Sequence, residues 1–172
     1  MTIFTIGHST RSLDEFLALL RAHDIRQLGD VRTVPKSRRH PHFAGDALAT
    51  SLPAAGIAYR HLPALGGLRK PRRDSKNGAW RHEGFRGYAD YMESTPFGEA
   101  IDDLVAWSKE SRTAVMCAEA VWWRCHRQLI ADALMARGVT VQHIQTATSA
   151  PAHKLTEFAR VAGIQVSYPG LV

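Results

Sequence analysis

Short β-rich runs alternate with longer amphipathic runs along most of this chain, and this alternation limits the possible folds more than any other feature. Residues 3–6 and 113–117 are apolar and rich in strand-forming types, whereas residues 125–137 carry apolar side chains at helical spacing. Strands separated by helices are joined by right-handed crossovers, which build a parallel sheet covered on both faces. We therefore predict one α/β domain, residues 1–172, with a mostly parallel sheet of about five strands and helices on both faces.

The boundaries of these elements follow from capping and turn residues. Ser12 and Glu15 have the spacing of a capping box at the start of the first helix. Pro96 divides a helical stretch at 85–110, with Thr95 as the expected cap of its second half. The predicted strands cover residues 3–6, 26–34, 58–62, 113–117 and 140–144, with an edge strand at 164–168. The other predicted helices cover 46–55 and 125–137, and a last helix begins at Ser149 and Pro151.

Residues 63–84 are rich in glycine, proline and charge and show no helical or strand pattern. A loop of this length in a compact domain is usually functional or disordered. We expect a long basic loop, or a lid over a site.

Composition excludes several classes of protein. With 45% hydrophobic residues and mixed charge the chain is typical of a globular domain. No apolar run approaches the roughly 20 residues that span a bilayer, so we expect no membrane partner. Two cysteines do not make a disulfide framework, and the chain starts directly with a strand pattern. A cytoplasmic protein with reduced thiols is expected.

The net charge of +6 is concentrated in two clusters of the sequence. Residues 32–39 contribute +4 and residues 69–86 contribute +5, so the rest of the chain is slightly acidic. Basic loops concentrate anions, and phosphate-bearing small molecules or nucleic acids are the expected partners. Solvated basic loops that only maintain solubility are the alternative. The sequence leaves the oligomeric state open.

Polar and reactive side chains follow each of the five predicted strands. Because ligands of parallel sheets bind beyond the carboxyl ends of the strands, we expect these side chains to form one site. In strand order they are His8 and Ser9, Asp30 and Arg32, His61, Cys117 and Glu119, and His143.

Cys125 follows Cys117 by eight residues and falls where a helix is expected to begin. Positive peptide dipoles at a helix start, together with the cationic neighbours Arg124, His126 and Arg127, favour a thiolate. The alternative is that both cysteines are small buried apolar residues.

Three chemistries can use these cysteines. In the first, one thiol is a nucleophile and His126, His8 or His143 is the acid or base. In the second, Cys117 and Cys125 with His8 and His143 bind zinc or iron, although no paired C-x-x-C supports this, and no cofactor is assigned. In the third, the two thiols form a reversible disulfide. A phosphatase-like loop needs five residues between cysteine and arginine, whereas Cys117 and Arg124 enclose six.

The candidate catalytic residues are accordingly Cys117, Glu119, Cys125, His126 and His8. Ten further residues are candidates for substrate binding, through charge, a close backbone approach or stacking on a planar ligand. They are Ser9, Asp30, Arg32, Arg38, His61, Gly66, Gly67, Arg69, Trp122 and Arg127.

Several short motifs occur together in a fixed order. They are Gly7-His8-Ser9, Asp30-Val-Arg32 with Pro35 and Ser37, Leu65-Gly-Gly67, Cys117-Ala-Glu119, Cys125-His-Arg127 and His143-Ile144. In these motifs the chain resembles the bacterial family called domain of unknown function 488, over roughly residues 2–143. The resemblance implies a single α/β domain with an enzymatic role suspected from its cysteines, and implies no particular reaction.

Three functions are therefore expected in order of preference. The first is a thiol-dependent enzyme that acts on an anionic substrate, such as a phosphate-bearing molecule, a nucleotide or a nucleic acid. The second is a catalytic or sensing protein with an iron or zinc site of cysteine and histidine. The third is a non-catalytic nucleic-acid-binding module.

Overall fold

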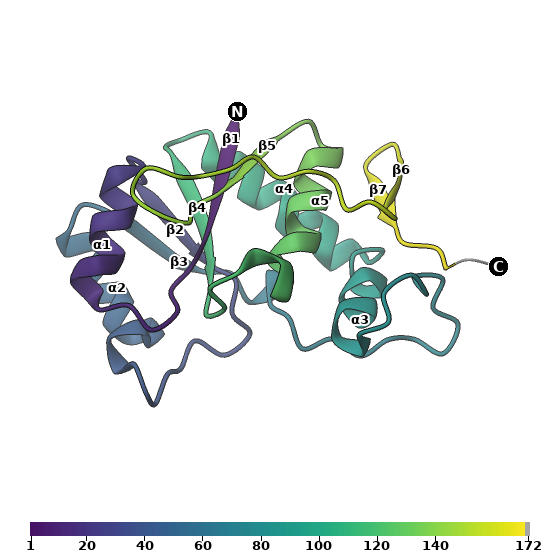
Figure 1. The fold of residues 1–172 in the computed structure, drawn as a ribbon, viewed down its shortest axis with the longest axis horizontal. Helices are drawn as coiled ribbons and strands as arrows, with labels where there is room; N and C mark the ends of the chain where they lie inside the picture. The colour runs from purple at the N-terminus through teal and green to yellow at the C-terminus, as the bar shows by residue number, and fades with distance from the viewer. Residues whose placement is uncertain (171–172) are drawn as a thin grey trace.

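A five-stranded, entirely parallel sheet forms the centre of the protein in the computed structural model, which describes residues 1–170 (Figure 1). Its strands lie in the order β3-β2-β4-β1-β5. This confirms the predicted fold class. The strands are β1 (Thr2–Gly7), β2 (Gln27–Asp30), β3 (Ala58–His61), β4 (Thr113–Cys117) and β5 (Thr140–His143).

Helices cover both faces of this sheet. One face packs against α1 (Leu13–Ala22) and α2 (Gly45–Ala54), and alternate residues such as Phe4 and Ile6 point into that core. The other face packs against α3 (Glu83–Tyr91), α4 (Thr95–Ser108) and α5 (Arg127–Ala136). Among residues 1–170, no helix combines the length and the apolar sequence needed to cross a membrane.

The capping predictions are largely confirmed. Ser12 and Glu15 form the complete capping box of α1. The helical stretch breaks between α3 and α4, but Ser94 rather than Thr95 caps α4, because its hydroxyl accepts from the backbone N–H of Phe97.

Two predicted elements are wrong in extent or type. The second strand ends at Asp30 rather than at residue 34, because the backbone N–H of Arg32 donates to the side chain of Asp30 and not to a neighbouring strand. The predicted last helix does not form. Residues 151–153 instead lie alongside β5, where His143 N–H bonds to Pro151 O and His153 N–H bonds to Val141 O.

The predicted edge strand at 164–168 also lies elsewhere. Strand β7 (Gln165–Ser167) pairs in antiparallel fashion with β6 (Arg160–Ala162) and forms a separate two-stranded hairpin. In Figure 1 this hairpin lies beside α5, away from the central sheet. The free edge of β5 is covered by residues 151–153 instead, which removes an unpaired strand edge.

The strand order places a crevice at the end of β4. The chain leaves β4 toward α5 on one face of the sheet, whereas it leaves the neighbouring strands β1 and β2 toward α1 and α2 on the other. Loops that diverge in this way open a ligand crevice beyond the carboxyl ends of the strands. The crevice therefore opens at Cys117, the last residue of β4.

The long basic loop is anchored by one buried carboxylate. Asp90 on α3 accepts from Arg72 N–H at 2.8 Å, Ser75 Oγ at 2.7 Å and Asn77 Nδ2 at 2.7 Å. Burial alone would raise the pKa of Asp90, but these hydrogen bonds outweigh it and lower the pKa. The side-chain oxygen of Asn77 in turn accepts from Tyr168 N–H, so the loop is tied to the C-terminal segment.

Removing this anchor is expected to release the loop. In Asp90→Ala, three loop donors lose their acceptor, and trypsin should cut the lysine- and arginine-rich segment at 69–76 many times faster than in the unchanged protein. Time-resolved trypsin digestion followed by mass spectrometry measures this. Asp74→Ala is the matched control, because Asp74 lies exposed on the same loop. Equal cleavage rates in both variants would contradict the anchoring role.

Candidate active site

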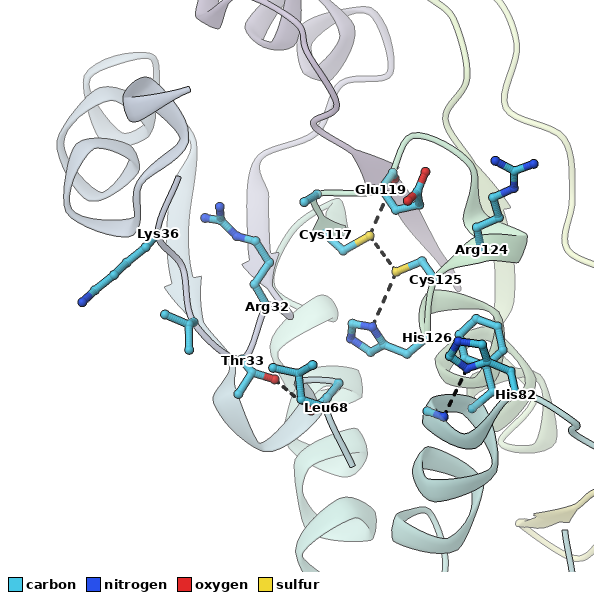
Figure 2. A pocket seen from close by; sticks show the side chains of 15 residues that line it. Arg32, Thr33, Lys36, Leu68, His82, Cys117, Glu119, Arg124, Cys125 and His126 are labelled. Atoms are coloured by element: carbon cyan, nitrogen blue, oxygen red, sulfur yellow. Dashed lines mark hydrogen bonds between the residues drawn. The ribbon is translucent and has the colours of Figure 1, made fainter. Parts of the chain in front are cut away.

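The two cysteines meet at the end of β4. Cys117 closes β4, and Cys125 lies just before α5, after the short 3-10 helix Trp122–Arg124. Their sulfur atoms are 2.7 Å apart and both residues are buried free thiols (Figure 2). The two cysteines, eight residues apart in the sequence, are therefore in direct contact.

Several donors surround the Cys125 sulfur. The Cys117 thiol touches it, Nδ1 of His126 lies 3.5 Å away, and the backbone N–H of Arg127 donates at 3.5 Å. Burial would raise the pKa of Cys125, but these hydrogen bonds and the charges of His126 and Arg127 lower it well below the ordinary value. The pKa of Cys117 is raised, first by burial and then by its neighbour Cys125. Cys125 is therefore the more acidic of the two thiols.

A hydrogen bond to a backbone carbonyl fixes the orientation of the His126 ring. Its Nε2 lies 2.9 Å from the carbonyl oxygen of Val31, which can only accept, so Nε2 carries a proton. Nδ1 then faces Cys125 and is free to hold its proton. A Cβ at Gly67 would lie 3.2 Å from Nδ1, tighter than an ordinary contact, so a glycine leaves the ring its room. Nucleophile, base and orienting group are all present.

Arg127 follows the thiols at the start of α5, where its backbone N–H donates to the Cys125 sulfur, and it is 1% exposed. Its guanidinium donates to Glu119 O at 2.7 Å, Ala120 O at 3.4 Å and Thr5 Oγ1 at 3.2 Å. Within residues 1–170 it has no carboxylate at ion-pair distance. A buried charge is costly unless an opposite charge compensates it, and Cys125, whose sulfur accepts from the Arg127 backbone N–H, is a nearby group that can become an anion.

Glu119 contributes through its backbone. Its carbonyl accepts from Arg127, lies 3.7 Å from the Cys117 sulfur, and packs directly against Gly7, where a Cβ would come within 1.8 Å of it. Its carboxylate is exposed at the rim. The close approach of β1 to the loop after β4 explains why a glycine stands at position 7.

A cavity of about 420 Å³, here called the thiol pocket, opens above the two sulfurs (Figure 2). Lys36 and Arg124 extend exposed ammonium and guanidinium groups at its rim. Leu68 lies at the mouth, 87% exposed and with a φ of 58°, a backbone conformation that a leucine rarely adopts. The lining also includes Arg32, Thr33, Val34, Gly67, His82, Gly84, Phe85, Cys117, Ala118, Glu119, Cys125 and His126.

Arg32 forms the wall of the pocket opposite the thiols. It pairs with Asp30 through Nε at 2.9 Å and Nη2 at 2.7 Å, and Tyr59 donates to the same carboxylate. His61 Nε2 lies 2.7 Å from the Arg32 carbonyl oxygen and supports this segment from β3. Asp30 and His61 therefore position Arg32 and do not line the pocket themselves.

A second cavity, of about 410 Å³, lies on the other side of residues 118–120 and is called the neighbouring hollow. Its lining includes His8, Ser9 and Arg38, and it shares Ala118 and Glu119 with the thiol pocket. Burial lowers the pKa of His8 to about 4, so its ring is neutral near neutral pH. No hydrogen bond joins His8 to either thiol in residues 1–170, and His126 takes the place predicted for a base.

Arg127, predicted to bind substrate, lines neither cavity, and four other predicted residues also lie outside both. Gly66 is buried below the pocket. The guanidinium of Arg69 stacks 3.7 Å from the ring centre of Tyr91, so this arginine does not face the thiols. Trp122 stacks on His143 with ring centres 4.3 Å apart, and both belong to a buried network behind the site.

The donor set proposed for zinc or iron does not assemble. Nδ1 of His143 is held by Thr5 at 2.6 Å and its Nε2 by His153 at 2.9 Å, away from Cys117 and Cys125. Across residues 1–170, no three histidine, cysteine, aspartate or glutamate side chains are grouped closely enough to hold a metal ion. The residues present therefore do not fit a metal centre.

Several contributors to the site were not predicted from the sequence. The Val31 carbonyl is a backbone group, and the strained Leu68 carries no sequence signal. Lys36 and Arg124 were visible in the basic cluster and beside Cys125, and their charge was the available signal. The cations of the second cluster, residues 69–86, do not line the thiol pocket, which receives His82, Gly84 and Phe85 from that segment.

The sulfur contact predicts rapid disulfide formation. Treatment with diamide should leave no free thiol and a monomeric product two hydrogen atoms lighter, because Cys125 is ionised and Cys117 lies against it. Intact-mass measurement and thiol counting check this, and dithiothreitol should restore both thiols. Cys117→Ser and Cys125→Ser are the controls, since neither can form the intramolecular bond. Two free thiols after treatment of the unchanged protein would show that the contact does not form in solution.

Comparison with known proteins gives one match. The model of the family described as "Domain of unknown function DUF488" matches residues 12–134, which include both cysteines, the Asp30–Arg32 pair and Gly67. The match leaves out His8 and His143. No curated protein and no solved structure matches the chain. Because the matched region is well over half of the sequence, the chain belongs to the DUF488 family.

Proposed function

We propose that this protein is a thiol-dependent enzyme in which Cys125 attacks an anionic substrate bound in the thiol pocket. The observation that carries the proposal is the Arg127 guanidinium, buried beside Cys125 without a carboxylate among residues 1–170. Such a charge favours a thiolate at Cys125, and the thiolate is the nucleophilic form of cysteine.

His126 handles the proton in this proposal. Nδ1 accepts the proton of Cys125 when the thiolate forms, and the bond from Nε2 to Val31 O keeps the ring in place. The thiolate then forms a bond to an electrophilic carbon or phosphorus of the substrate, and the leaving group departs with the proton held on His126. Water attacks the covalent intermediate, gives a proton back to His126 and releases the product with Cys125 free.

The pocket lining supports the substrate class. Lys36 and Arg124 at the rim favour a negatively charged group, and a phosphate fits two such cations best. Val34, Leu68 and Phe85 give the same pocket an apolar side. A phosphate-bearing molecule with an apolar or planar part, such as a nucleotide, matches both features.

A cytoplasmic location is part of this proposal. Cys117 and Cys125 are free thiols in contact, and such a pair stays reduced only in a reducing compartment.

The reactive thiolate and the enzymatic role of Cys125 are tested separately, and alkylation tests the thiolate. Iodoacetamide should modify Cys125 at a pH well below the ordinary thiol range, and Cys117 far more slowly, because only Cys125 is ionised. Peptide mass spectrometry assigns the site. Slow modification of Cys125 until about pH 8 would contradict a reactive thiolate. Once a substrate is found, Cys125→Ser should abolish turnover.

The charge of the pocket is tested with iodoacetate, the anionic counterpart of iodoacetamide. The measured quantity is the rate of Cys125 alkylation by iodoacetate divided by the rate by iodoacetamide. The cations of the pocket should raise this ratio, and the double variant Lys36→Gln, Arg124→Gln should lower it by roughly five- to tenfold at low salt. The matched control is Arg21→Gln, Lys109→Gln, which removes two exposed cations outside the pocket. An equal loss in both double variants, or none in either, would contradict an anion-binding pocket.

A further inference from the structure

A continuous chain of buried hydrogen bonds runs from Arg127 to Asp132. Nη1 of Arg127 donates to Thr5 Oγ1 at 3.2 Å, and Thr5 Oγ1 lies 2.6 Å from His143 Nδ1. His143 Nε2 lies 2.9 Å from His153 Nδ1, and His153 Nε2 lies 2.8 Å from Asp132 Oδ1. All five side chains are at most 5% exposed. The chain therefore joins a buried cation to a buried anion that are not in contact.

The chemistry of the two ends fixes the direction of every proton in between. A guanidinium only donates, so Thr5 accepts from Arg127 and gives its own proton to His143 Nδ1. Burial lowers the pKa of His143 to about 3, so its ring is neutral and protonated on Nε2. That proton goes to His153 Nδ1, and the Nε2 proton of His153 goes to the Asp132 carboxylate. With both rings neutral, every donor from Thr5 to His153 has an acceptor, whereas Nε of Arg127 has none among residues 1–170.

The chain also fixes the site to the rest of the fold. Asp132 accepts from the backbone N–H of Thr156 at 3.0 Å and from the Tyr168 hydroxyl at 2.7 Å. Trp122, in the turn that leads to Cys125, stacks on His143 with an interplanar angle of 4°. The network thus contacts the thiol site at two points, the guanidinium and the turn.

We propose that Thr5, His143, His153 and Asp132 are positioning residues that hold the Arg127 guanidinium against the Cys125 thiolate. The other acceptors of Arg127 are carbonyls at 119 and 120, on an exposed loop, whereas Thr5 lies in the buried middle strands of the sheet. The inference rests on the proposed function, because it assigns these four residues to the same reactive thiol.

The remaining ionisable groups around Cys125 do not replace this role. Cys117 faces it from β4, and His126 faces it from α5. Tyr88 on α3 packs against His126 with ring centres 5.1 Å apart, and burial raises the pKa of its hydroxyl, which donates to Leu65 O. Arg127 carries a permanent charge: its backbone N–H contacts the Cys125 sulfur, and its guanidinium donates to Glu119 O, which lies 3.7 Å from the Cys117 sulfur.

The test measures the rate of iodoacetamide alkylation at Cys125 as a function of pH. Thr5→Val keeps the shape of the side chain but removes the hydroxyl. At a pH below the alkylation midpoints of both the variant and the unchanged protein, the rate in the variant should be lower by roughly tenfold, as the loss of one charge-assisted hydrogen bond implies. Thr5→Ser keeps the hydroxyl and should retain the original profile. His143→Phe keeps an aromatic ring on Trp122 without the nitrogens and should behave as Thr5→Val does.

Thr113→Val is the matched control, because Thr113 is a fully buried, hydrogen-bonded threonine at the opposite end of the sheet. Its profile should be unchanged, and circular dichroism verifies folding of each variant. A low alkylation midpoint that stays the same in Thr5→Val and His143→Phe would overturn the positioning role and leave the proposed function standing. An ordinary midpoint in the unchanged protein would overturn the proposed function, and the positioning role with it.

Discussion

The organisation of this site depends on one buried positive charge without a carboxylate beside it. Arg127 holds the loop after β4 through the carbonyls of residues 119 and 120, reaches β1 through Thr5, and lies under Cys125. Neutral acceptors solvate a guanidinium but do not balance its charge, and charge imbalance is what burial penalises most. In the proposed function, the Cys125 thiolate supplies a negative charge near this cation while its proton stays on His126, so the group that holds the loop also favours the nucleophile.

The sheet order explains why these groups meet. β4 lies between β1 and β2, and its connection leaves on the opposite face from both neighbours, so Cys117 stands where the loops diverge. The chain then returns across that opening with Cys125 and His126 just before α5 and Arg127 as its first residue. The two cysteine segments contact each other because of this topology, and neither forms the site alone.

The sequence predicts the parallel sheet, the capping box and the gathering of reactive side chains at one edge, because periodicity, caps and strand ends are local signals. Which side of that edge a residue faces depends on packing, which local signals do not give. His143 and Arg69 therefore face away from the thiols, contrary to the prediction, and the unpredicted carbonyl of Val31 contacts His126. The last helix was predicted from a local cap, but tertiary bonds to Asp132 and β5 hold residues 151–156 extended.

The most direct measurement of the central claim is an ultraviolet titration of thiolate absorbance in the reduced protein. In the unchanged protein we expect one thiolate equivalent at about pH 7, with the second thiol ionising only far above the ordinary range. This thiolate should be absent in Cys125→Ser and strongly reduced in Arg127→Gln. Absorbance that rises only in the ordinary cysteine range, or that is unchanged in Arg127→Gln, would contradict a thiolate held by the buried guanidinium.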